Sequence, residues 1–194
     1  MNYAKLFALA AMALTVLIPF AGTASASRVT SPPGTLYTGT IKATSTDTKW
    51  TNSSTIGTVS CEHSEMVGTV KGHGSSATAI VSLSTLTFSK CTGGEPTSPV
   101  GFPGSLELHL TTAPNGTTTS SGAVVIIHKT LVGSCSFRTN EKPADIGTFT
   151  GGTPAKLDIG SSPIPQGSNN MFCPSSANLS GTYTFTSPGS LLLS

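Results

Sequence analysis

Three polar side chains, Glu107, His109 and His128, come nearest in this sequence to a set of residues that could do chemistry. Glu107 and His109 alternate with leucines over residues 105–112, so in a β-strand they would share the face opposite the leucines. His128 lies in the apolar segment 123–131, which we expect to form a hairpin with residues 105–112. The three side chains would then share one polar face and could bind a metal ion or transfer protons. The competing interpretation, which we favour, is a solvent-exposed face with one Glu–His contact.

A second set of polar residues surrounds Cys61: Glu62, His63, Glu65 and His73. Glu62 and Glu65 would suit glycoside hydrolysis if their carboxyl groups lay about 5–10 Å apart. A solvated turn beside a cysteine is the simpler interpretation. The sequence has no Gly-x-Ser-x-Gly, His-Glu-x-x-His, phosphate-binding or Asp-rich calcium-binding motif. We therefore expect no cofactor, no metal ion and no catalytic residue, and we lean against an enzyme.

The four cysteines, Cys61, Cys91, Cys135 and Cys173, favour two disulfides. Four cysteines allow three pairings, and the sequence does not choose among them. We predict the sequential pairing, Cys61–Cys91 and Cys135–Cys173, because it gives each half of the chain one covalent link. A zinc site is the alternative, but there is no Cys-x-x-Cys spacing to support it.

Residues 1–26 resemble a secretory signal peptide rather than part of a fold. Lys5 precedes an almost wholly apolar run, and Ala24-Ser25-Ala26 forms a cleavage signal. Cleavage after Ala26 would leave residues 27–194, and we expect them to form a single domain released from the cell. Apart from this leader, we expect no stable insertion into a membrane, because no later stretch has the roughly 20 apolar residues of a spanning helix.

The composition of residues 27–194 bounds the fold and the partners. Nine basic residues face eight acidic ones once Lys5 is removed, so no electrostatic footprint for nucleic acid or an anionic membrane is present. The chain is rich in Thr, Ser and Gly and shows alternating segments without helical periodicity. We predict an all-β fold, an antiparallel, Greek-key-like β-sandwich of about ten short strands. A sandwich is favoured over a closed barrel because the strands are uneven in length and long loops interrupt them.

Three stretches rich in Gly, Pro, Asn, Ser and Thr are predicted to be loops: residues 92–103, 113–122 and 160–170. A Gly-Thr pair followed by a β-branched or aromatic residue recurs five times, at Gly39, Gly57, Gly68, Gly147 and Gly181. The last three follow Cys61, Cys135 and Cys173 by seven to twelve residues. Glycine inside a strand often marks a β-bulge. We weigh that interpretation evenly against chance in a Gly- and Thr-rich chain.

Over most of residues 27–194 the chain resembles a group of small, uncharacterised secreted proteins of actinobacteria. The resemblance rests on Gly57–Cys61, Thr87–Cys91 and the Cys-Pro-Ser-Ser-Ala-x-Leu-x-Gly-Thr-Tyr element at Cys173–Tyr183. It implies an exported all-β protein and carries no catalytic residue with it. We therefore expect a secreted, non-enzymatic extracellular binding or structural module with a protein partner or a surface polymer. The alternatives are a secreted hydrolase built on strand-borne Glu and His residues, and a secreted inhibitor.

Overall fold

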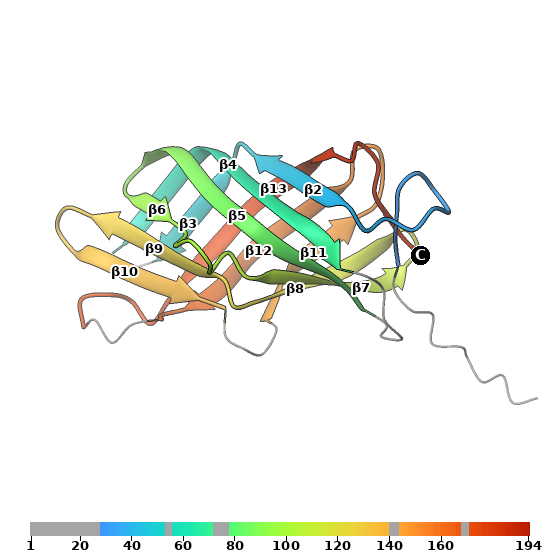
Figure 1. The fold of residues 1–194 in the computed structure, drawn as a ribbon. Coiled ribbons are helices and arrows are strands. Elements are labelled where there is room, and N and C mark those ends of the chain that lie inside the picture. Colours follow the sequence, from blue (N-terminus) through green and yellow to red (C-terminus); the bar gives the residue numbers. More distant parts are fainter. Residues whose placement is uncertain (1–27, 53–55, 72–77, 140–143, 168–170) are drawn as a thin grey trace, which may run out of the picture.

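The chain is all-β in a computed structural model, which describes residues 28–52, 56–71, 78–139, 144–167 and 171–194 (Figure 1). The predicted leader, residues 1–26, lies outside the described residues. The strands are β1 (Val29–Thr30), β2 (Thr40–Ser45), β3 (Thr48–Asn52), β4 (Gly57–Lys71), β5 (Thr78–Thr92), β6 (Glu95–Thr97), β7 (Ser105–Thr112), β8 (Asn115–Ser121), β9 (Val124–Lys129), β10 (Gly133–Arg138), β11 (Ala144–Thr150), β12 (Lys156–Pro165), β13 (Ser176–Ser187) and β14 (Leu192–Leu193).

The main sheet is a closed eight-stranded antiparallel barrel rather than a clear sandwich. Around the barrel the strands follow the order β2, β4, β5, β7, β8, β11, β12 and β13, and β13 pairs with β2 to close the ring. Strand β3 lies in line with β2 in the barrel wall, because both strands pair with β4 on one side and with β13 on the other. The predicted Greek-key-like sandwich was therefore wrong in topology. Each barrel strand pairs with the next barrel strand along the chain, which is an up-and-down arrangement.

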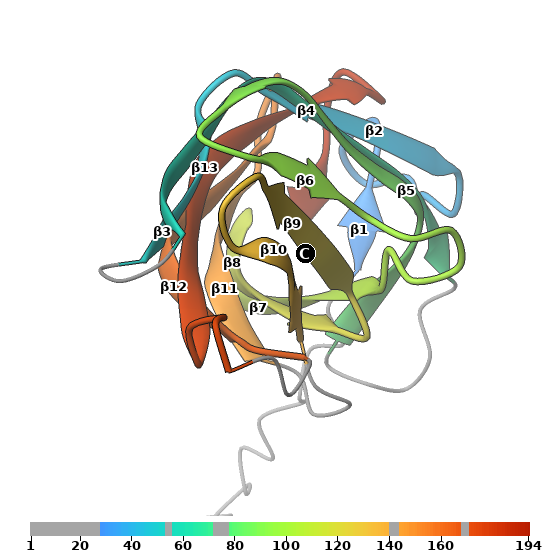
Figure 2. The same cartoon turned by 90° about the vertical axis from the view of Figure 1, so that its left-hand side faces the viewer.

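Two smaller sheets complete the fold. Strands β10, β9 and β6 form a three-stranded sheet, and β1 pairs with β14. Figure 2, which looks along the barrel, shows β6, β9 and β10 in front of the ring of strands and within its outline. The ring of Phe137 on β10 lies 6.1 Å from that of Trp50 on β3, so the small sheet packs its inner face against the barrel strands.

β-Bulges accompany the three glycines that follow cysteines. The register between neighbouring strands shifts at Gly68 on β4, at Gly147 on β11 and beside Gly181 on β13. A Cβ atom on Gly147 would lie 1.9 Å from the Asp158 carbonyl oxygen, and one on Gly68 would lie 2.8 Å from that of Ser82. Bulges bend strands and help a sheet to close on itself. Of the two interpretations of the Gly-Thr pattern, the structure supports a bulge in the glycine's own strand at Gly147, whereas at Gly68 and Gly181 the extra residue lies on the partner strand, β5 or β12.

Both disulfides have the predicted sequential pairing. Cys61 on β4 is bonded to Cys91 on β5, its direct neighbour across the two strands. Cys135 on β10 is bonded to Cys173, which precedes β13. The second disulfide therefore ties the three-stranded sheet to the segment that leads into the barrel.

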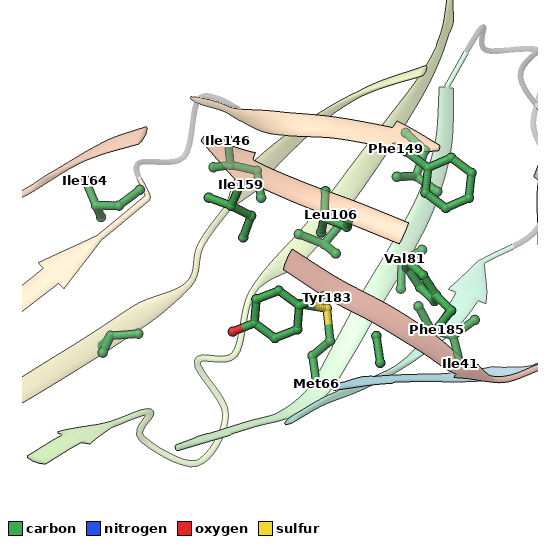
Figure 3. Close-up of a cluster of buried hydrophobic side chains, with 14 of the residues drawn as sticks. Ile41, Met66, Val81, Leu106, Ile146, Phe149, Ile159, Ile164, Tyr183 and Phe185 are labelled. Carbon is green, nitrogen blue, oxygen red and sulfur yellow. The ribbon is translucent and has the colours of Figure 1, made fainter. Parts of the chain in front are cut away.

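The barrel interior is packed differently along its length (Figure 3). In one part, Phe149 and Phe185 meet edge to face with ring centroids 5.7 Å apart, beside the buried Ile41 and Val81. Tyr183 lies in the other part and its hydroxyl points away from the phenylalanine pair. An eight-stranded barrel has an interior that side chains just fill or that holds one small ligand. The part around Tyr183 is the one that is not filled.

Candidate functional site

A cavity of about 50 Å³ lies inside the barrel, where the three-stranded sheet packs against it. On this measure one water molecule needs about 10–15 Å³, so the cavity has room for roughly three to five waters or a ligand group of similar bulk. Its lining comes from nearly every strand of the barrel and from β9 and β10: Trp50, Met66, Leu83, Leu86, Phe88, Pro103, Leu106, Ser120, Ala123, Val125, Phe137, Thr139, Ile146, Ile159, Ile164, Leu179 and Tyr183. This lining is apolar and contains no carboxylate, imidazole, amine or guanidinium group.

The cavity comes nearest to solvent along β5. Most lining residues are buried, but five are only partly buried: Leu83, Leu86 and Phe88 on β5, Ala123, and Leu179 on β13. Within the described residues, β5 pairs with both β4 and β7 up to Ser82 and with β4 only beyond it. A small molecule would therefore enter the barrel most directly beside this half of β5.

Four of the lining residues have an oxygen or nitrogen atom in the side chain, and in three of them this atom already has a partner. Ser120 and Thr139 place their hydroxyl oxygens 3.3 Å apart, and Thr139 Oγ1 also accepts a hydrogen bond from the Ala123 N–H. The Tyr183 hydroxyl lies 2.7 Å from Ser64 Oγ. These three hydroxyl groups are therefore satisfied within the protein.

The fourth polar side chain, Trp50, has no partner for its indole nitrogen. Trp50 is 2% exposed, and its Nε1 atom is buried without a hydrogen-bond acceptor. The rings of Phe88 and Phe137, which also line the cavity, lie 6.4 and 6.1 Å away. An unsatisfied buried donor costs about 1–3 kcal/mol, so it is an uncommon feature that calls for a reason.

A buried hydroxyl cluster sits beside the cavity. Thr48 Oγ1 on β3 donates to the Tyr183 hydroxyl at 3.4 Å, and the Ser64 hydroxyl on β4 contacts the same oxygen. Burial raises the pKa of the Tyr183 phenol above its ordinary value, although the hydrogen bonds to Ser64 and Thr48 oppose this. Tyr183 therefore stays neutral and acts as a hydrogen-bonding group rather than as a base.

The turn between β2 and β3 is fastened to β13 by Asp47. Its Oδ1 atom accepts hydrogen bonds from the Ser45 hydroxyl at 2.8 Å and the Thr182 N–H at 3.0 Å. Partial burial by itself would raise the pKa of this carboxyl. The hydrogen bonds, together with the charge of Lys49, outweigh burial and hold the pKa below its usual value. Asp47 thus has a structural role at the edge of the hydroxyl cluster.

The structure brings Glu107 and His109 together but places His128 elsewhere. Glu107 Oε2 lies 3.8 Å from His109 Nε2 on the outer side of β7. The predicted hairpin with residues 123–131 was wrong, because β7 pairs instead with β8, which runs through the predicted loop 113–122. His109 accordingly contacts the hydroxyls of Thr78 and Thr119, at 3.3 Å each, on its two neighbouring strands.

His128 belongs to the three-stranded sheet and lines a surface groove of about 760 Å³. Its Nδ1 atom lies 2.8 Å from Ser134 Oγ, and its Nε2 atom lies 3.2 Å from Thr97 Oγ1. Glu95 is its direct neighbour across β6 and β9. The histidine is exposed and its two ring nitrogens lie beside hydroxyl groups, so within the described residues neither nitrogen is placed for the carboxylate bond of a Ser–His–acid arrangement.

The polar residues around Cys61 do not form a chemical site in the described structure. Glu65 pairs with Lys42, with 2.8 Å between carboxylate and ammonium, and Glu62 is exposed. His73 lies outside the described residues. Across the described ranges, no three His, Cys, Asp or Glu side chains gather closely enough to hold a metal ion.

The cavity was missed from the sequence because its residues are scattered over ten strands and none forms a motif. The one available signal was the single tryptophan within a polar segment.

Comparison with protein-family models, curated proteins and solved structures finds no match to this chain. In the part of the chain that is described, we find no helix with the length and apolar character needed to cross a membrane.

Proposed function

We propose that this chain is an extracellular, non-enzymatic binding module that holds a small, largely apolar ligand inside its barrel. The observation that carries the proposal is the cavity of about 50 Å³ beside Trp50 and Tyr183. An apolar cavity with a few polar atoms is the usual form of a small-molecule site. Because no lining residue has an acidic, basic or metal-binding side chain, the cavity is better suited to binding than to catalysis.

The extracellular location is part of the same proposal. All four cysteines are in disulfides, which persist in oxidising compartments, and residues 1–26 have the pattern of a secretory leader. Expression of the full chain in an actinobacterial host should release a protein that begins at Ser27. Its intact mass would reveal this, and a protein retained in the cell with its leader uncleaved would contradict the proposal.

The binding experiment compares two variants of β5. Leu86 faces the cavity, and Thr87, next in the chain, is exposed. Leu86→Phe should fill part of the cavity, whereas Thr87→Phe adds an aromatic side chain of the same kind outside it. Xenon, which occupies apolar cavities, is the probe.

We expect xenon to perturb methyl resonances of the lining residues in the wild type and in Thr87→Phe, and to do so much less in Leu86→Phe. Thermal unfolding of each variant shows whether it is folded. If Leu86→Phe does not fold, the wild-type titration still decides, because shifts confined to residues outside the lining would contradict a site in the barrel.

A secreted hydrolase is the second candidate, favoured by the contact of 2.8 Å between Ser134 Oγ and His128 Nδ1 in the surface groove. A fluorophosphonate probe would label Ser134 if His128 activated it. We expect no labelling, because the imidazole lacks an orienting carboxylate in this arrangement. Labelling that is lost in Ser134→Ala would replace the binding proposal with an enzymatic one.

A protein or polymer partner would most readily contact the exposed apolar side chains at the loop ends. Leu131 is 96% exposed at the tip of the β9–β10 hairpin, and Met171 is 86% exposed before Cys173. We treat such a partner as additional to the cavity ligand, since the cavity is too small for a polymer.

A further inference from the structure

The lining of the cavity and the strand beside it define how a ligand would lie in the barrel. Resting on the proposed function, we infer that the ligand is an amphiphile, a molecule with an alkyl end and a polar head. The alkyl end, about four carbons long, fills the cavity, and the head stays in solvent beside β5. Fatty acids, alkyl alcohols and alkyl amines belong to this chemical class.

Among the described residues, the cavity offers no partner to a polar atom of a ligand. The hydroxyls of Ser120 and Thr139 lie 3.3 Å apart, and the Tyr183 hydroxyl lies 2.7 Å from Ser64 Oγ. The indole Nε1 atom of Trp50 is buried within the protein, so a ligand does not reach it. A hydroxyl or carbonyl group brought into this cavity would lose its hydrogen bonds to water and gain none. The part of the ligand inside the barrel must therefore be a hydrocarbon.

The volume of the cavity limits the length of that hydrocarbon. A cavity of about 50 Å³ has room for roughly three to five waters, and a methylene group has roughly the bulk of one water. An alkyl segment of about four carbons therefore fills it. Leu106, Ile146 and Ile159 are among the apolar side chains that it would contact (Figure 3). Each methylene group that leaves water for this site should lower Kd about fourfold.

The polar head meets solvent beside β5. Leu83, Leu86 and Phe88 line the cavity and are only partly buried. Thr85 and Thr87 lie between them on the same strand and are exposed, so hydroxyl groups and water surround this part of the wall. A head left at this surface keeps its hydration and is not desolvated. The cavity therefore selects the alkyl end of the ligand, and it accommodates heads of either charge.

The test compares hexanoate with 6-hydroxyhexanoate, which differ by one hydroxyl at the end of the chain. Hexanoate is long enough for about four carbons to enter the cavity while its carboxylate remains outside. NMR titrations followed on methyl resonances of the lining residues give the Kd values. We expect hexanoate to bind at least about tenfold more tightly, because the added hydroxyl would be buried without a partner. Hexylammonium should bind within about tenfold of hexanoate, because exposed charges interact weakly through water.

Two variants of β5 show whether the chain enters the barrel. Leu86→Phe reduces the room in the cavity and should raise the Kd for hexanoate by about tenfold, the effect of excluding about two methylene groups. Thr87→Phe adds the same ring at an exposed position and should leave this Kd unchanged.

The outcomes separate this inference from the proposed function. The inference is overturned if hexanoate and 6-hydroxyhexanoate bind equally, if hexylammonium and hexanoate differ by more than about tenfold, or if a folded Leu86→Phe variant binds hexanoate as the wild type does. If xenon enters the cavity but hexanoate perturbs no lining methyl group, the inference fails and the proposed function stands. If neither probe reaches the lining, the proposed function itself fails. Should Leu86→Phe not fold, the three wild-type affinities still decide the question.

Discussion

Gly147 on β11 is the position where one added methyl group should cost the most. The glycine lies at the bulge where β11 changes register against β8, and its other side faces β12. In Gly147→Ala the new Cβ would lie 1.9 Å from the Asp158 carbonyl oxygen and 3.0 Å from the Ile159 Cα atom. Both contacts are with backbone, so no side-chain rotation relieves them.

The size of the effect follows from the displacement that is needed. To reach even a tight contact, β12 must move from β11 by about 1 Å, and in a closed barrel β12 is also held by β13. The movement would strain the pairs Thr148↔Asp158 and Phe149↔Leu157. Each backbone hydrogen bond contributes about 1 kcal/mol, and Phe149 and Leu157 are fully buried. We expect a loss of about 3–5 kcal/mol in the free energy of unfolding, a large part of the ~5–15 kcal/mol of a typical domain.

Urea unfolding, followed by circular dichroism and by the fluorescence of Trp50, measures this loss. Gly160→Ala is the matched control, because a Cβ atom at Gly160 meets no heavy atom within 4 Å. We expect the control to change stability by no more than about 0.5 kcal/mol. If Gly147→Ala costs less than about 1 kcal/mol, the bulge does not depend on glycine and our account of how the barrel closes is wrong.

Three further predictions concern the links between the sheets and the buried polar groups. Replacing Cys135 and Cys173 together by Ala opens a link across 38 residues and should lower stability by about 4 kcal/mol in thermal or urea unfolding. Tyr183→Phe leaves Ser64 without its partner at 2.7 Å and should lower the free energy of unfolding by about 1–3 kcal/mol. In the wild type, burial raises the pKa of Tyr183, so the stability is full below the ordinary pKa of 10.0 and falls as the pH rises above it. Absorbance at 295 nm should therefore show Tyr183 ionising together with unfolding. Asp47→Asn should flatten the acid limb of the stability profile, because a lowered pKa contributes stability above the ordinary value of 3.8 that is lost as the pH falls through the folded-state pKa.

Each of these has an outcome that would count against its reasoning. A double Cys variant as stable as the wild type would mean that packing, rather than the disulfide, holds the three-stranded sheet in place. Ionisation of Tyr183 with the ordinary pKa of about 10.0, without unfolding, would mean that the phenol is open to solvent. An acid limb unchanged in Asp47→Asn would mean that other carboxylates account for it.

Local patterns were enough to predict the strand content, whereas the sequential disulfides were one of three pairings that the sequence allows and the bulges were weighed evenly against chance. The sequential pairing was chosen because it gives each half of the chain one covalent link, and the structure pairs Cys61 directly with Cys91 across β4 and β5. Of the glycines at positions 68, 147 and 181, only Gly147 interrupts the alternation of its own strand, and the extra residue of the bulge there is Ile146. Alternation depends on neighbouring residues, so a linear sequence contains it.

Closure of the barrel was not predicted, because the strands that complete it carry little apolar alternation. Strand β8 consists of Asn, Gly, Thr and Ser, yet Thr118 on it is fully buried. Strand β12 extends to Pro165 through a segment that we predicted to be a loop. Hydroxyl-bearing side chains give weak signals of burial, and without β8 the segments 105–112 and 123–131 were the nearest apolar partners. The false hairpin and the misplaced His128 both follow from this omission.

The pairing of β1 with β14 has a consequence for how the domain can be rearranged. The Arg28 N–H and the Ser194 carbonyl oxygen are 2.9 Å apart, and the reverse bond measures 3.0 Å. The first and last described residues are thus adjacent, so the backbone runs almost as a closed circle. A short linker from Ser194 to Arg28 should permit circular permutation, with new ends at the exposed Leu131 tip. Such a permutant would keep every barrel strand and leave the cavity untouched, while presenting both new ends beside the surface groove.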